Sequence, residues 1–125
     1  MNTILKTVQH VLPAVFCLCL LQCAGSDTLP GEISGTWTTS DESCAGEYIE
    51  LTEKTVAFGI EGGERHEFPV IKVEADKGHL FGSTLYSIYY ADAAGAKNLF
   101  RILYTPEDGG TLRQKSAQDV IWKRK

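Results

Sequence analysis

The chain has little of what several classes of protein require. Its longest apolar run, Val11–Leu21, has 11 residues, whereas a helix that spans a bilayer needs about 20. Lys and Arg number 12 against 16 Asp and Glu, so there is no basic excess to bind nucleic-acid phosphates. These shortages argue against a spanning helix and against a nucleic-acid partner. The 125 residues suffice for one domain with a modest core.

Motifs for catalysis and for metal binding are also missing. The chain has no Gly-x-Ser-x-Gly elbow, no His-Glu-x-x-His and no glycine loop that opens a helix. Cys44 lies in the acidic loop Ser40–Gly46, which raises the pKa of a thiol and makes it a poor nucleophile. The sequence therefore predicts neither an enzyme nor a cofactor. Four side chains that invite a metal interpretation have no known ligand spacing: Glu64, His66, Glu74 and His79.

The N-terminal segment has the features of an export signal. Lys6 precedes the apolar run, and 11 residues match the length of a signal-peptide core, which is about 7–15. Pro13 inside the run opposes a buried helix of the folded domain. We therefore expect residues 1–22 to be a signal peptide.

The end of that run, Leu20-Leu21-Gln22-Cys23 followed by Ala24, resembles the lipobox of bacterial lipoproteins. The resemblance implies that Cys23 is the first mature residue and carries fatty-acyl chains such as palmitate. It also implies a lipid-anchored protein of the cell envelope, sorted to the outer membrane because Ala24 follows the cysteine. The alternative is ordinary signal cleavage after Gly25, which releases a periplasmic or secreted protein.

The cysteines depend on that choice. Cys17 and Cys19 leave with the signal, so the mature chain keeps Cys23 and Cys44. A lipid on Cys23 leaves Cys44 unpaired, whereas a retained, unlipidated Cys23 permits a Cys23–Cys44 disulfide. The two modifications exclude each other.

The mature chain has the pattern of an all-β protein. No stretch shows apolar residues at helical spacing over the length of a major helix, and short β-rich runs alternate with turn signals. We expect a linker over residues 23–32 and a β domain over residues 33–125. Eight strands are predicted: Ile33–Thr39, Glu47–Leu51, Thr55–Ile60, Glu64–Glu74, Gly78–Ala91, Lys97–Thr105, Gly110–Gln114 and Gln118–Arg124.

The connections between these strands are short and contain glycine, as in Glu61–Gly63 and Ala75–Gly78. Parallel crossovers need a dozen or more residues, so the strands form an antiparallel up-and-down meander. Eight such strands tend to close into a barrel, which removes both sheet edges. The alternative is a β-sandwich with a solid core.

Gly35-Thr36-Trp37, near the start of the first strand, resembles the Gly-x-Trp signature of lipocalins and related small barrels. The resemblance implies that Trp37 plugs one end of the barrel and that a basic side chain of the last strand lies against it. Arg124 is the nearest candidate for that side chain. Trp122 lies in the last strand, where the closing seam is expected.

Alternation in the strands points aromatic side chains to one face, and that face predicts either a core or a ligand site. If it is a site, the ligand is a small apolar or aromatic molecule. The alternative function is an envelope protein-interaction or inhibitor module that binds no small ligand and docks a basic protein partner through acidic loops. We expect the recognition surface at the rim formed by Ser40–Gly46, Glu61–Gly63 and Asp92–Ala96. The candidate ligand-binding residues are Trp37, Tyr86, Tyr90, Phe100 and Tyr104.

Overall fold

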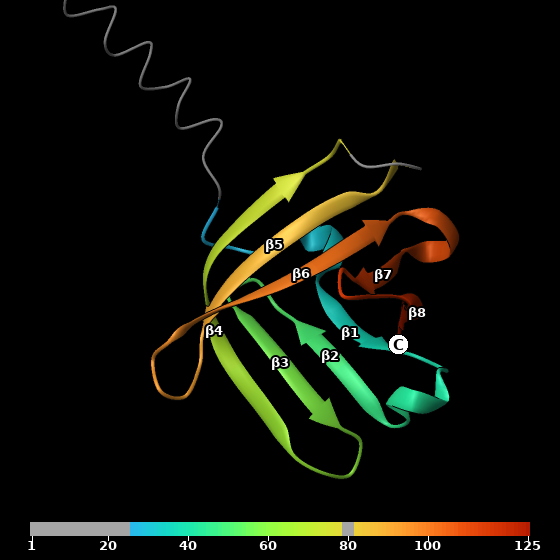
Figure 1. Cartoon of the computed structure of the whole chain (residues 1–125), viewed down its shortest axis with the longest axis horizontal. Helices are drawn as coiled ribbons and strands as arrows, with labels where there is room; N and C mark the ends of the chain where they lie inside the picture. The colour runs from blue at the N-terminus through green and yellow to red at the C-terminus, as the bar shows by residue number, and fades with distance from the viewer. Residues whose placement is uncertain (1–25, 79–81) are drawn as a thin grey trace, which may run out of the picture.

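Short segments with alternating burial form eight antiparallel strands, and each strand pairs with the next along the chain (Figure 1). The first strand also pairs with the last, which closes the barrel and excludes the sandwich. The computed structural model describes residues 26–78 and 82–125. The expected signal peptide, Cys23 and His79 lie outside these residues. The prediction of an all-β, eight-stranded up-and-down barrel is confirmed.

Three strands have the bounds that the sequence predicts: β2 (Glu47–Leu51), β3 (Thr55–Ile60) and β6 (Lys97–Thr105). The other strands are β1 (Gly35–Thr38), β4 (Arg65–Asp76), β5 (Thr84–Ala91), β7 (Thr111–Gln114) and β8 (Ala117–Arg124). Three short 3-10 turns are η1 (Gly31–Ile33), η2 (Glu42–Cys44) and η4 (Glu107–Gly109).

Two predicted strands start more than one residue too early in the sequence. The first begins at Gly35 instead of Ile33, because Gly31–Ile33 forms the turn η1 and sends the Ile33 side chain into the core. The fifth begins at Thr84 instead of Gly78, because its partner β6 ends at Thr105, immediately before a proline. The alternation that follows is as expected, with Thr84, Tyr86 and Ile88 buried.

The segment before η1 packs on the barrel, although the sequence predicts a linker there. Ser26 exchanges two main-chain hydrogen bonds with Val73 of β4, at 2.9 and 2.5 Å. The Leu29 N–H donates to the carbonyl of Glu53 at 2.8 Å, and the Leu29 side chain is 4% exposed. The folded domain therefore extends back to Ser26.

Candidate functional site

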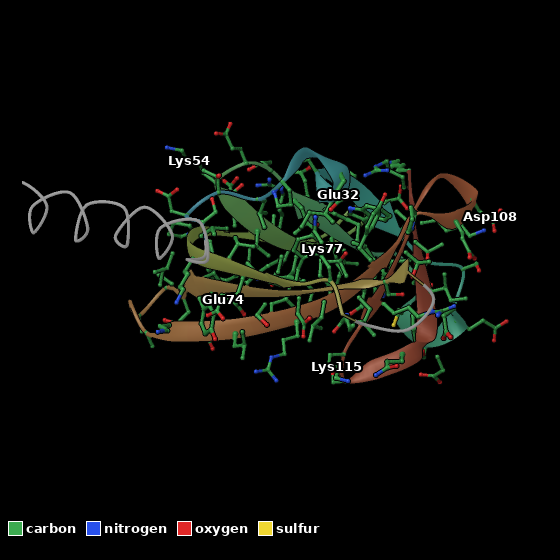
Figure 2. The ribbon with its side chains drawn as sticks, turned by 90° about the horizontal axis from the view of Figure 1, so that it is seen from above. Glu32, Lys54, Glu74, Lys77, Asp108 and Lys115 are labelled. Atoms are coloured by element: carbon green, nitrogen blue, oxygen red, sulfur yellow. The ribbon has the colours of Figure 1, made fainter. Side chains whose placement is uncertain are left out.

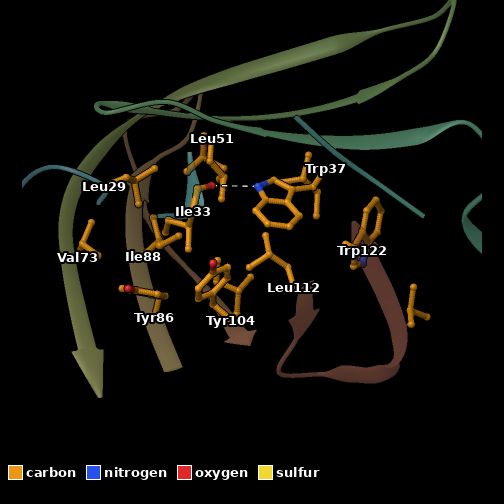
Figure 3. Close-up of a cluster of buried hydrophobic side chains, with 14 residues drawn as sticks. Leu29, Ile33, Trp37, Leu51, Val73, Tyr86, Ile88, Tyr104, Leu112 and Trp122 are labelled. Atoms are coloured by element: carbon orange, nitrogen blue, oxygen red, sulfur yellow. Dashed lines mark hydrogen bonds between the residues drawn. The ribbon is translucent and has the colours of Figure 1, made fainter. Parts of the chain in front are cut away.

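The end of the barrel covered by η1, called here the closed end, is filled with side chains (Figure 3). Trp37 and Ile33 are both 0% exposed, and the Trp37 indole Nε1 donates to the Ile33 carbonyl at 2.9 Å. Because the buried N–H has an acceptor, Trp37 is held in one orientation. Further members of this core are Leu29, Leu51, Val73, Tyr86, Ile88, Tyr104, Leu112 and Trp122.

Arg124 covers Trp37 from the last strand. Its guanidinium carbon lies 4.5 Å from the centroid of the indole ring, a cation–π geometry. The same guanidinium donates to the carbonyl of Gly109 at 3.2 Å and to the carbonyl of Glu32. Arg124 therefore ties β8, η4 and η1 together, and it occupies the position that the resemblance to lipocalins implies.

Tyr86 is a core residue with a satisfied hydroxyl. The side chain is 3% exposed, and its hydroxyl donates to the carboxylate of Glu32 on η1. Desolvation, together with the hydrogen bond to Glu32, raises the pKa of Tyr86 well above its ordinary value. The hydroxyl thus has a partner within the protein and does not need a ligand to provide one.

The opposite end, called here the open end, carries the hairpin turns after β3 and β5 and contains an aromatic cluster. The cluster consists of Phe58, Phe68, Tyr90 and Phe100, one from each of β3, β4, β5 and β6. Phe58 lies 5.1 Å from Phe100 and Phe68 lies 5.2 Å from Tyr90, measured between ring centroids. All four rings are partly exposed, in contrast to the closed end.

The five residues predicted to bind a ligand are divided between the two ends. Trp37, Tyr86 and Tyr104 belong to the closed-end core, where the Tyr104 ring packs edge-on against Trp37 at 6.4 Å. Tyr90 and Phe100 belong to the aromatic cluster. The five therefore do not line one common cavity.

Sequence reasoning missed Phe58 and Phe68. Both alternate with outward-facing neighbours, but the strand register decides which rings meet: Phe58 lies opposite His66, and Phe68 lies opposite Val56. One signal in the sequence points to them: Phe58 comes two residues after Val56, and residues two apart in a strand point to the same face of the sheet, here the inward one.

Two grooves lie on the barrel surface. One, of about 420 Å³, reaches the aromatic cluster at Phe100 and is called here the side groove. Its lining residues are Leu99, Phe100, Arg101, Gln114, Lys115 and Ser116. The other, of about 410 Å³, lies over β1, β2 and the turn after β3, and its lining residues include Thr36, Thr38 and Tyr48.

The rim expected to be the recognition surface lies at the open end. The Glu61 N–H donates to the Gly46 carbonyl at 2.8 Å, which joins two of its three loops. Cys44 is partly buried against the core. The Ser43 hydroxyl lowers the pKa of the Cys44 thiol, but desolvation and the carboxylates of Glu47 and Asp41 outweigh it and raise that pKa above its ordinary value. This direction agrees with the acidic sequence.

Metal-ligand geometry and membrane helices are both absent from residues 26–78 and 82–125. No group of three or more His, Cys, Asp or Glu side chains in these segments converges on a point that would hold a metal ion. His66 pairs with Glu64 at 3.2 Å, and both side chains are exposed. No helix in these segments is long and apolar enough to cross a bilayer.

Comparisons of the chain with models of known families, with curated proteins and with solved structures found no match.

Proposed function

We propose that the protein is a lipid-anchored envelope protein whose lipocalin-like barrel binds a small apolar or aromatic ligand at the aromatic cluster. The observation that carries the proposal is the contrast in exposure between the two ends. Aromatic side chains on one inward face are normally buried, yet Phe58, Phe68, Tyr90 and Phe100 remain partly exposed at the open end. The side groove reaches this cluster at Phe100, and pockets lined by aromatic side chains are typical of small-molecule binding.

The anchor part of the proposal is supported by the lipobox-like sequence that ends at Cys23, and the position of Ser26 indicates how such an anchor would orient the barrel. Ser26 is hydrogen-bonded to Val73, and three residues of extended chain span at most about 11 Å. A lipid on Cys23 would therefore hold the side of the barrel that carries Lys54 and Glu74, away from Asp108 (Figure 2). The open-end rim would then be free to meet a ligand.

Ligand binding is tested with two adjacent tyrosines of β5 that point to opposite faces. Tyr90 belongs to the aromatic cluster, whereas the Tyr89 ring lies outside, with the Lys97 ammonium 4.9 Å from its centroid. The mature chain, residues 23–125, is made with Cys23→Ala so that no lipid competes for the probe. Calorimetric titration with 2-naphthylmethanol is then compared between the parent, Tyr90→Ala and Tyr89→Ala.

We expect saturable binding that Tyr90→Ala weakens about tenfold and that Tyr89→Ala leaves within twofold, because only Tyr90 contacts the probe. Equal losses in the two variants would show that binding is unrelated to the cluster. No binding of this alcohol or of its carboxylic acid analogue to the parent would remove the ligand hypothesis.

The anchor is tested separately, by the intact mass of protein purified from its native membrane. Acyl chains on a chain that starts at Cys23, absent in Cys23→Ala, would support it. Orientation is then measured with fluorescent labels at Ile71→Cys and Ile60→Cys, in a Cys44→Ser background. Both isoleucines are exposed, at 44% and 51%, but Ile71 lies two residues from Val73 and Ile60 lies at the open end. Lipid-phase quenchers should reach the label at residue 71 and not the label at residue 60.

The alternative, docking of a basic protein through acidic loops, has less support. Asp41 and Asp92 are two of the rim carboxylates, and both are engaged in local hydrogen bonds. Asp41 accepts hydrogen bonds from Ser43, and Asp92 accepts from Asn98, Ala94 and Ala96. These hydrogen bonds lower the pKa of both carboxyls. Salt-sensitive capture of a cationic protein, with no probe binding, would favour this alternative.

A further inference from the structure

β6 extends beyond its neighbour β7 and leaves a gap in the barrel wall. The register between the two strands starts at Ile102, which lies opposite Gln114, and one more hydrogen bond joins the Lys115 N–H to the Arg101 carbonyl at 3.0 Å. Lys97–Phe100 continue to pair with β5 on the other side. No strand of the described chain covers their β7 side. The side groove lies in this gap and opens onto Phe100 of the aromatic cluster.

Two cations flank this groove. The side chains of Arg101 and Lys115 both line it, and neither forms an ion pair or a side-chain hydrogen bond with any residue that the structure describes. This positive charge contrasts with the chain as a whole, which carries a net charge of −4. By contrast, Arg65 is paired with Glu50 at 2.5 Å and Lys72 with Glu74 at 3.3 Å.

Apolar residues line the groove beside these cations. Leu99 is 44% exposed at its wall, and the partly exposed Phe100 ring forms the link to the cluster, 5.1 Å from Phe58. Lys115 projects into solvent at the edge of the barrel (Figure 2). The groove therefore combines positive charge with aliphatic and aromatic residues in a volume of about 420 Å³.

We infer that the ligand is an amphipathic acid, which enters through the side groove with its anionic group at Arg101 and Lys115 and its apolar body on Phe100. This inference rests on the proposed function, since it assigns the chemical class of the ligand to the same aromatic cluster. Arg presents a planar fork of N–H donors that matches a carboxylate. Fatty acids and aromatic acids share this chemistry.

The test compares two probes of the same shape and different charge, 2-naphthoate and 2-naphthylmethanol, on the mature chain with Cys23→Ala. The same titrations are repeated with Arg101→Gln, Lys115→Gln and the control Lys97→Gln. Lys97 lies on the same strand and outer face as Arg101 but outside the groove, over Tyr89. Every variant thus removes one positive charge from an exposed residue. Thermal unfolding confirms that each variant is folded.

The acid should bind about tenfold more tightly than the alcohol, and Arg101→Gln should remove most of that difference. Lys115→Gln should remove part of it, and Lys97→Gln should leave it unchanged. Equal binding of the two probes to the parent would overturn the inference and leave the proposed function standing. Loss of the difference in Lys97→Gln would also overturn it, because the overall field would then be the cause. Failure of both probes to bind would overturn the two proposals together.

Discussion

The two ends of the barrel are built from the same alternating strands but differ in what their aromatic side chains do. At the closed end, Trp37, Tyr86 and Tyr104 are at most 8% exposed, and the indole and the Tyr86 hydroxyl have partners inside the protein. At the open end, the rings of Phe58 and Phe68 lie 6.4 Å apart between centroids, and both remain partly exposed although Phe58 also packs against the core. The aromatic side chains of the closed end therefore belong to the core, whereas those of the open end keep part of their surface accessible.

This difference comes from what covers each end. Residues 26–33 lie across the closed end and insert Leu29 and Ile33, whereas the open end is bordered by polar turns. A segment that precedes the first strand thus decides which half of the interior becomes core. The comparison predicts that substitutions at the closed end cost stability, while those at the open end change binding.

The largest effect is expected for Trp37→Ala. It removes a fully buried side chain, deprives Arg124 of its ring and leaves the Ile33 carbonyl without its donor, so it should lower the free energy of unfolding by about 3–5 kcal/mol. Urea denaturation followed by circular dichroism measures this loss. Ile121→Ala, an exposed position on β8, is the control and should cost less than about 0.5 kcal/mol. A loss below about 1 kcal/mol for Trp37→Ala would contradict the assignment of the closed end as core.

A matched pair of glycines separates backbone strain from packing at the two ends. Gly110 at the closed end and Gly62 at the open end have φ of 97° and 75°, where a side chain is strained. A Cβ at Gly110 would lie 3.0 Å from the Tyr104 ring, whereas nothing lies within 4 Å of one at Gly62. Gly110→Ala should cost about 2–3 kcal/mol and Gly62→Ala about 1 kcal/mol in urea denaturation. Equal losses of stability in the two variants would mean that the closed end is packed no more tightly than the open end.

Tyr86→Phe should have a smaller effect, about 1–2 kcal/mol near neutral pH, because it removes one hydrogen bond and keeps the ring. The raised pKa of Tyr86 means that the folded state holds its proton more tightly than the unfolded state. This contribution is complete below the unfolded pKa of about 10 and is lost as the pH rises above it. Stability measured between pH 8 and pH 11 should therefore fall less steeply in Tyr86→Phe than in the parent. Parallel pH curves would contradict this account.

The smallest effect concerns Cys44 at the open-end rim. Because the pKa of its thiol is raised, less thiolate is present at pH 8 than in a free cysteine. Alkylation by iodoacetamide should be slower at pH 8 than for a model thiol. Its rate should reach its maximum at a higher pH than the rate of the model thiol does. Mass spectrometry of the Cys23→Ala chain measures the rate, and Glu47→Gln should raise it. Alkylation faster than that of the model thiol would show that Cys44 is activated.

Much of the barrel is predictable from the sequence, because alternation and glycine-rich turns are local signals. β2, β3 and β6 have the predicted bounds, and Trp37 is buried as the Gly-x-Trp pattern implies. The partners of these residues are not local. Glu32 meets Tyr86 across 54 positions of sequence, and Arg124 meets the carbonyl of Glu32 across 92.

The candidate site was only half predictable for the same reason. Tyr90 and Phe100 are on strands with strong alternation, so the sequence predicts that they point inward. Which rings surround them depends on the register of β3 and β4. The sequence also does not predict the pairing of Ser26 with Val73, because Ser26–Pro30 has the composition of a linker. Only the packed barrel shows that Leu29 is buried.

The most direct test of the central claim is an NMR titration of the mature Cys23→Ala chain with 2-naphthoate. The Trp37 indole N–H, bonded to the Ile33 carbonyl, reports on the closed end, and the ring protons of Phe58, Phe68, Tyr90 and Phe100 report on the open end. The account predicts shifts that saturate at the four rings while the indole signal stays in place. Saturating shifts at the indole with silent open-end rings would contradict it.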